Sequence, residues 1–121
     1  MKEQSLRDEL NRMAALPGMQ GCALVEVSVG MVWYAAGQSL EMQNISEAAS
    51  DYWRLYQRLN GHFSQLGDMK AAVFMHVHGR ITLMPCGKDM LLVALTQEST
   101  LVNWAQWQSQ AKELASLVNR L

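Results

Sequence analysis

The sequence contains few cysteines and no long apolar segment, and each scarcity excludes a class of protein. Cys22 and Cys86 are its two cysteines and lie far apart in strand-like runs, so without an export signal buried thiols are favoured over a disulfide. The N-terminal stretch MKEQSLRDEL lacks the apolar core of a signal peptide. No apolar run approaches the roughly 20 residues that a membrane span needs. We therefore expect a cytoplasmic protein that does not enter a membrane.

An excess of charge of one sign is also missing. Ten Lys and Arg residues face eleven Asp and Glu residues, which gives a net charge of −1. These charges are scattered, with no basic cluster to neutralise a row of phosphates, so nucleic-acid binding is not supported. At 121 residues, 50% apolar and 17% charged, the composition is that of a globular protein with room for one domain, residues 1–121.

The patterns of a catalytic or metal centre are missing as well. The segment PCGKD (85–89) contains Gly-Lys but lacks the spacer, first glycine and hydroxyl of a phosphate-binding loop, so it is predicted to be a turn. His76 and His78 are spaced to face one side of a strand, but no third metal ligand follows at a usable spacing. No G-x-S-x-G elbow occurs, and Glu26 has no carboxylate partner at a fixed spacing. We expect no enzyme, no cofactor and no metal.

The apolar periodicity that is present predicts eight elements in the order αββαβββα. Helical patterns occur at 5–16, 45–67 and 99–121, and strand patterns at 21–27, 31–37, 71–78, 80–85 and 89–96. Short connections make neighbouring strands antiparallel. Five antiparallel strands with three helices must bury the helix stripes on the sheet, which predicts an α+β layered domain.

The helical segment 45–67 carries the clearest apolar stripe. Its members fall within about 120° of arc and are expected to be mostly core: Ala48, Ala49, Tyr52, Leu55, Tyr56, Leu59, Phe63 and Leu66. Trp53 lies on the shoulder of this stripe beside polar Gln57. Two readings of Trp53 remain open, a side chain half-covered by a loop and an interface anchor.

The strand pattern at 71–78 contains no proline, no lysine and no other charge before its histidines. As an open sheet edge, such a strand would invite pairing with another chain, and a two-fold copy of the same chain is the simplest cover.

Two long stretches resemble the roadblock/dynein-light-chain family. In LNRMAALPGMQGCALVEVSVGMVWYAAG, a helix ending in Leu-Pro-Gly leads into a hydrophobic hairpin. In GRITLMPCGKDMLLVALTQESTLVNWAQWQ, a glycine, an apolar strand and Pro-x-Gly precede an apolar strand that leads into the last helix. The resemblance implies a five-stranded antiparallel sheet with helices on both faces: the central helix on one, the terminal helices on the other, and the third strand at an edge.

The resemblance also implies a site and a role. Two copies join edge to edge through the third strand (71–78) and the central helix (46–66). The implied dimer-interface residues are Tyr52, Tyr56, Val73, Phe74, Met75 and His76, and the partner-binding candidates are Trp53, Gln57 and Asn60. Family members are non-catalytic adaptors, and in prokaryotes they are partners or activators of Ras-like small GTPases. We therefore expect a homodimeric adaptor that binds a Ras-like small GTPase. The alternative is a small-molecule sensor, with a cavity between sheet and helices lined by Trp33, Tyr34 or Met75.

Overall fold

The computed structural model describes residues 2–97 and 102–120. Within them the elements follow the predicted order αββαβββα, with one 3-10 helix, η1, added after the second α-helix. This order confirms the predicted α+β class. The elements are α1 (Lys2–Ala14), β1 (Met19–Glu26), β2 (Met31–Gly37), α2 (Met42–Leu59), η1 (Asn60–Leu66), β3 (Ala72–Met75), β4 (Arg80–Pro85), β5 (Met90–Thr96) and α3 (Trp104–Val118).

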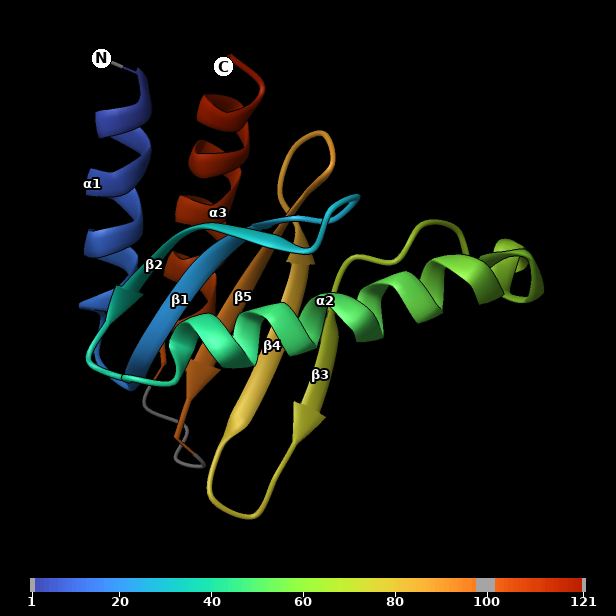
Figure 1. Cartoon of the computed structure of the whole chain (residues 1–121), viewed down its shortest axis with the longest axis horizontal. Coiled ribbons are helices and arrows are strands. Elements are labelled where there is room, and N and C mark those ends of the chain that lie inside the picture. The colour runs from blue at the N-terminus through green and yellow to red at the C-terminus, as the bar shows by residue number, and fades with distance from the viewer. Residues whose placement is uncertain (1, 98–101, 121) are drawn as a thin grey trace.

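The five strands form one antiparallel sheet in the order β2-β1-β5-β4-β3 (Figure 1). Strands β3, β4 and β5 make the predicted meander, and β1 pairs with both β2 and β5. β3 therefore lies at an edge of the sheet, as the family resemblance implies. In the part of the chain that the structure describes, its outer side is not paired with another strand.

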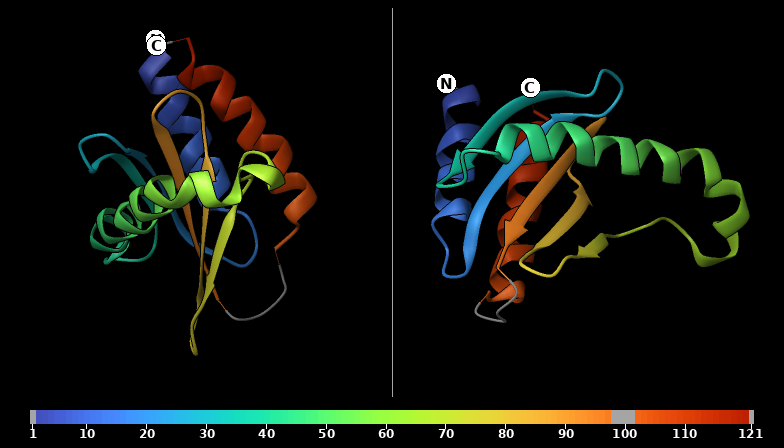
Figure 2. Two further views of the ribbon diagram at one scale, coloured as in Figure 1. Left: turned by 90° about the vertical axis from the view of Figure 1, so that its right-hand side faces the viewer. Right: turned by 60° about the horizontal axis from the view of Figure 1, so that its bottom comes forward.

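Alternating side chains of the central strands build two cores, one on each face of the sheet. Along β1, Cys22 and Leu24 pack with α1 and α3, whereas Ala23 and Val25 pack with α2. Helices therefore cover both faces, as expected (Figure 2). Cys22 and Cys86 are free and buried, as predicted, and burial raises the pKa of each thiol to about 12.

The central helix has different bounds from those expected. α2 begins at Met42 with no side-chain cap from Glu41, before the predicted pattern at 45–67 and the implied helix at 46–66, and it ends at Leu59. The last part of the predicted helix forms η1 instead. Gly61 is a poor α-helix former, and 3-10 turns are frequent at helix C-termini, which together explain the change of helix type.

The edge strand is shorter than the predicted run 71–78. β3 ends at Met75, because the backbone N–H of His76 donates to the carbonyl oxygen of Gly79 (2.8 Å) and closes a tight turn into β4. His76 and His78 lie in this turn, so the expectation that both face one side of a strand was wrong.

The turn predicted at 85–89 is confirmed between β4 and β5, with Pro85 as the last residue of β4. Gly87 adopts a positive φ of 79°, and a Cβ at this position would lie 2.8 Å from Val118 Cγ1 of α3. The backbone N–H of Lys88 donates to Asn119 Oδ1 (3.1 Å). The turn is therefore packed against the C-terminal end of α3.

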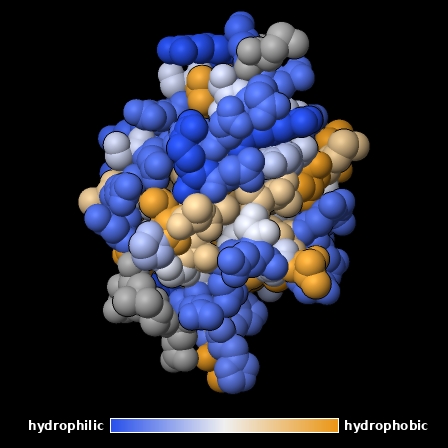
Figure 3. Space-filling view, turned by 90° about the vertical axis from the view of Figure 1, so that its left-hand side faces the viewer, coloured by the Kyte–Doolittle hydropathy of each residue, from blue (hydrophilic) through white to orange (hydrophobic). Residues whose placement is uncertain are grey.

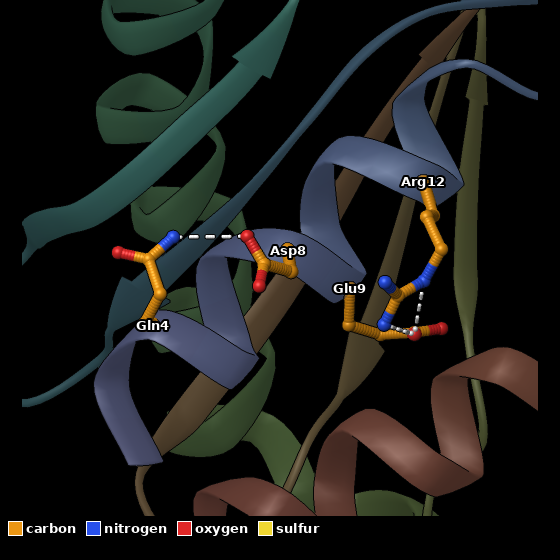
Figure 4. Close-up of polar contacts among 4 residues, drawn as sticks. All are labelled: Gln4, Asp8, Glu9 and Arg12. Carbon is orange, nitrogen blue, oxygen red and sulfur yellow. Dashed lines mark hydrogen bonds and ion pairs between the residues drawn. The ribbon is translucent and has the colours of Figure 1, made fainter. Parts of the chain in front are cut away.

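On the other side of α3, helix α1 carries a local network of polar side chains (Figure 4). Arg12 donates two hydrogen bonds to Glu9 Oε2, at 3.1 and 2.7 Å, and Gln4 donates to Asp8 at 2.9 Å. The bonds to the Glu9 carboxylate raise the pKa of the Arg12 guanidinium. Glu9 is 5% exposed, so its pairing with Arg12 offsets part of the cost of burying a carboxylate.

Candidate functional site

Helix α2 has two apolar faces, and its own sheet covers one of them. The buried residues are Met42, Ser46, Ala49, Ser50 and Trp53. Tyr52, Leu55 and Leu59 remain 44%, 44% and 42% exposed. At 100° per residue, the centre of this exposed apolar face lies about 130° around the helix from the centre of the buried face. The expectation that the longer apolar stripe is mostly core was wrong.

Trp53 differs most between the sequence-based expectation and the structure. It is 7% exposed and packs against the sheet with Ala23, Val25 and Leu91, near the centre of the buried face of α2. The sheet covers it, so Trp53 is a core residue of this chain, neither half-covered by a loop nor exposed as an interface anchor. The sequence signal for this arrangement is present but weak, because the neighbours of Trp53 on this face are small (Ser46, Ala49 and Ser50).

The exposed apolar face of α2 continues onto the edge strand. The Tyr52 ring stacks on Phe74 of β3, with centroids 4.3 Å apart and planes 17° from parallel. Val73 and Met75 lie on the other face of β3 and are 51% and 72% exposed. His76 follows at the start of the turn and is also exposed.

Further along, the Tyr56 ring stacks on Phe63 of η1 at 5.9 Å, and Tyr56 Oη donates to Asn60 Oδ1 (3.3 Å). Beyond the edge strand, the C-terminal part of α2 and η1 project past the sheet (Figure 1). Exposed and half-buried apolar residues of α2, η1 and β3 thus lie beside the unpaired edge, with Val73 and Met75 on the opposite face of β3 from Phe74. We call this surface the seam face: Tyr52, Leu55, Tyr56, Leu59, Phe63, Val73, Phe74 and Met75.

The opposite edge of the sheet is better protected. Trp33 and Tyr34 of β2 are half-buried, and the Arg7 guanidinium of α1 lies over both rings, 5.8 and 5.6 Å from their centroids. Asn11 Nδ2 donates to Tyr34 Oη (3.1 Å). Figure 3 shows this side of the molecule covered largely by hydrophilic residues, with apolar ones in a band across the middle. The seam face is therefore the stronger candidate for association.

A cleft next to the seam face brings together the three partner-binding candidates. Trp53, Gln57 and Asn60 line it together with Tyr56 of α2, the segment 68–69 and the turn 85–90. Its volume is about 320 Å³. The charged residues among its described lining are Asp68 and Asp89, both carboxylates, so the cleft favours a cationic group. Trp53 contributes to the cleft wall but, at 7% exposed, offers a partner little surface.

Comparison with solved structures identifies the fold. No protein-family model and no curated protein matches the sequence. Among solved structures, a roadblock/LC7 domain from Streptomyces avermitilis superimposes with a TM-score of 0.75 at 17% identity, over 96% of this chain and 93% of that one. This chain has the roadblock fold. Myxococcus xanthus MglB shares it, with a TM-score of 0.76 at 13% identity over 97% of each chain. So does an MglB with a tetrameric arrangement, with a TM-score of 0.79 at 15% identity over 98% of this chain and 91% of that one.

Within this roadblock fold, the residues expected to line a sensor cavity do not come together. Trp33 and Tyr34 lie on β2 at one edge of the sheet, and Met75 lies on β3 at the other. An apolar cavity does exist, between α3 and the outer strands, and it is lined in part by Trp104 and Trp107. The i, i+3 spacing of the two tryptophans predicted that they share one face of the helix, but such a spacing is just as typical of core residues as of a cavity wall.

The two cysteines of this chain are poorly suited to nucleophilic chemistry. Since burial raises the pKa of Cys22 and Cys86 to about 12, both are thiols at neutral pH and poor nucleophiles.

In residues 2–97 and 102–120, no group of three or more His, Cys, Asp or Glu side chains is arranged to hold a metal ion. None of the described helices is long and apolar enough to cross a membrane.

Proposed function

We propose that this protein is a non-catalytic homodimeric adaptor whose two copies join through the seam face. The observation that carries the proposal is an unpaired, uncharged edge strand beside an exposed apolar helix face. Strand β3 (Ala72–Met75) contains no proline, charge or bulge, the usual devices that protect an edge. An edge of this kind is stabilised when another strand supplies the missing backbone hydrogen bonds.

A two-fold copy of the same chain supplies them most simply. Antiparallel pairing of two β3 strands about a two-fold axis joins two five-stranded sheets into one of ten strands. The same axis brings the two α2 helices together, because Tyr52 of α2 already stacks on Phe74 of β3. Leu55, Leu59 and Phe63, each at least 40% exposed in one chain, then face their counterparts and leave water.

The proposed partner is a Ras-like small GTPase, as the resemblance of the sequence to the roadblock family implies. The roadblock fold and the MglB structures among its neighbours support this choice. In the proposed dimer, the two clefts that contain Gln57 and Asn60 lie close to the paired helices, so one partner can contact both copies. A basic side chain of the partner fits the carboxylates of Asp68 and Asp89. Any acceleration of GTP hydrolysis would come from ordering the GTPase's own residues.

The dimer is tested by size-exclusion chromatography with light scattering. The expected mass is twice 13.6 kDa, about 27 kDa, for the native chain and 13.6 kDa for Phe74→Asp, because a carboxylate at the seam cannot be buried unpaired. Val29→Asp is the matched control, since Val29 is 61% exposed in the β1–β2 turn away from the seam. A native chain of 13.6 kDa at high concentration would refute the seam, and a mass above 27 kDa would indicate a larger assembly.

The partner is tested by affinity capture from native cells with mass spectrometry. A small GTPase that is recovered with the native chain and lost with Gln57→Ala/Asn60→Ala supports the proposal. Arg58→Ala is the control, because Arg58 is exposed on the same helix but does not line the cleft. Repeated captures that recover no GTPase would leave a dimeric scaffold with a different partner.

A further inference from the structure

A cavity of about 240 Å³ lies between α3 and the outer half of the sheet, separate from the acidic cleft beside α2. Its floor consists of alternate residues of β4, which all point toward α3: Arg80, Thr82 and Met84. Val73 of the edge strand is the register partner of Thr82 and extends this floor. Trp104 and Trp107, on the first turns of α3, form the opposite wall.

Two polar groups in this cavity have no partner in the described structure. Thr82 is 5% exposed, and its Oγ1 makes no hydrogen bond. The Nε of Arg80 is buried and also makes none. Among the described residues, the ion pairs are Arg12 with Glu9 and Arg54 with Asp51, so the Arg80 charge is left without a carboxylate. Buried donors without acceptors are uncommon in folded proteins and point to a group that completes them.

The rest of the lining fixes the chemistry of such a group. The aromatic walls, with Trp104 and Trp107 edge to face at 6.2 Å, favour a compact apolar body. The Trp107 indole N–H already donates to Met84 Sδ (3.2 Å), so it does not compete for an acceptor. Among the described residues that line the cavity none is Asp or Glu, and the remaining polar side chain, Gln108, is uncharged, so the field of this lining is positive at Arg80. A carboxylate that accepts from Arg80 Nε and the Thr82 hydroxyl satisfies both unmet groups.

We propose that this cavity binds a small carboxylate with an apolar or aromatic body. Its volume is below the roughly 300 Å³ at which pockets for drug-sized ligands begin, which limits the ligand to a short acyl or aryl chain. The site goes beyond the adaptor role and does not depend on it. Since Val73 belongs to both the cavity and the seam face, the site is also placed where a ligand could influence the proposed pairing of β3.

The test is isothermal titration of the native chain with phenylacetate and with neutral phenylacetamide, which has nearly the same shape. Saturable binding of phenylacetate, at least tenfold tighter than that of the amide, is expected. Arg80→Met keeps the aliphatic stem and should weaken phenylacetate binding at least tenfold. Thr82→Val, which keeps the shape, should weaken it severalfold and provides a second variant if Arg80→Met does not fold. Arg58→Met on α2 is the matched control and should bind like the native chain.

Three results would overturn the proposal: no saturable binding of phenylacetate, equal binding of acid and amide, or unchanged affinity in both cavity variants. A side chain of a second copy could instead occupy the cavity. In that case the Phe74→Asp monomer would bind phenylacetate at least tenfold more tightly than the native chain, and the cavity would belong to the interface and not to a ligand. The light-scattering test of the dimer is independent of the three overturning results, whereas occupation by a second copy also requires the native chain to be a dimer in that test.

Discussion

Tyr52 and Trp53 are neighbours in the sequence, and the structure predicts opposite consequences for their replacement by alanine. Trp53 is 7% exposed in the core between α2 and the sheet, and loss of a buried large aromatic costs about 3–5 kcal/mol. Such a loss is a large fraction of the roughly 5–15 kcal/mol by which small proteins are stable. Tyr52 is 44% exposed, and its main described contact is the stack on Phe74, so Tyr52→Ala costs the isolated chain about 1 kcal/mol.

The assay is urea unfolding at two protein concentrations that differ tenfold. If folding is coupled to dimer formation, the apparent free energy of unfolding rises with concentration by mass action. Trp53→Ala should lower this free energy by about 3–5 kcal/mol at both concentrations. Tyr52→Ala should lower it slightly and remove the concentration dependence, because it weakens the seam face. Arg58→Ala, an exposed polar site on the same helix, should stay within about 0.5 kcal/mol of the native chain.

The assignment of the buried face of α2 is refuted if Tyr52→Ala destabilises the chain more than Trp53→Ala does. A Tyr52→Ala chain less stable than Trp53→Ala at low concentration would mean that the helix lies the other way round. A native chain without concentration dependence, together with a monomer mass, would mean that the seam face is not an interface under these conditions.

Two further predictions concern the turn that packs on α3 and the buried thiols. Gly87→Ala should lower the free energy of unfolding in urea by roughly 1–3 kcal/mol, because the residue has φ 79° and the added methyl meets the end of α3. Gly61→Ala is the control: a methyl there has open space around it, so the variant should be as stable as the native chain or more stable. Stability should also fall as pH rises above 9, since Cys22 and Cys86 ionise near 9.0 when unfolded but near 12 when folded, so the unfolded state loses these protons first. The free energy of unfolding should fall by up to about 1.4 kcal/mol per pH unit for each thiol. The double variant Cys22→Ala/Cys86→Ala should show a smaller fall between pH 9 and 10.5. Equal slopes in the native chain and the variant would contradict the burial of the thiols.

The sequence determined the local elements well, because each depends on neighbours along the chain. Alternating apolar residues predicted the five strands, and the glycines at 79 and 87 fell in turns as expected. Errors occurred where competing local preferences are nearly balanced. Gly61 changed the end of α2 into η1, and the bond from His76 N–H to Gly79 shortened β3.

What α2 buries could not be decided from its sequence. The periodicity identified Tyr52, Leu55 and Leu59 as an apolar stripe, but burial of apolar surface is favourable whichever surface covers it. A stripe that the fold leaves exposed therefore looks, in the sequence, like a stripe that the fold buries. The structure separates the two, because Trp53 fills the space above Ala23 and Val25 while the other stripe extends over the edge strand.

The sequence was equally unable to predict which polar groups meet in the acidic cleft and in the cavity under α3. Gln57 and Asn60 could be selected from the resemblance, but Asp68 and Asp89 join them only through the packing of distant turns. The cavity with Arg80 and Thr82 depends on how α3 lies across β4, which no local pattern specifies. The sequence alone thus determined the elements, their order and the absence of familiar catalytic patterns, since these follow from short-range periodicity and spacing. The tertiary structure decided which apolar face stays open and which polar groups meet, because these depend on contacts between segments far apart in the chain.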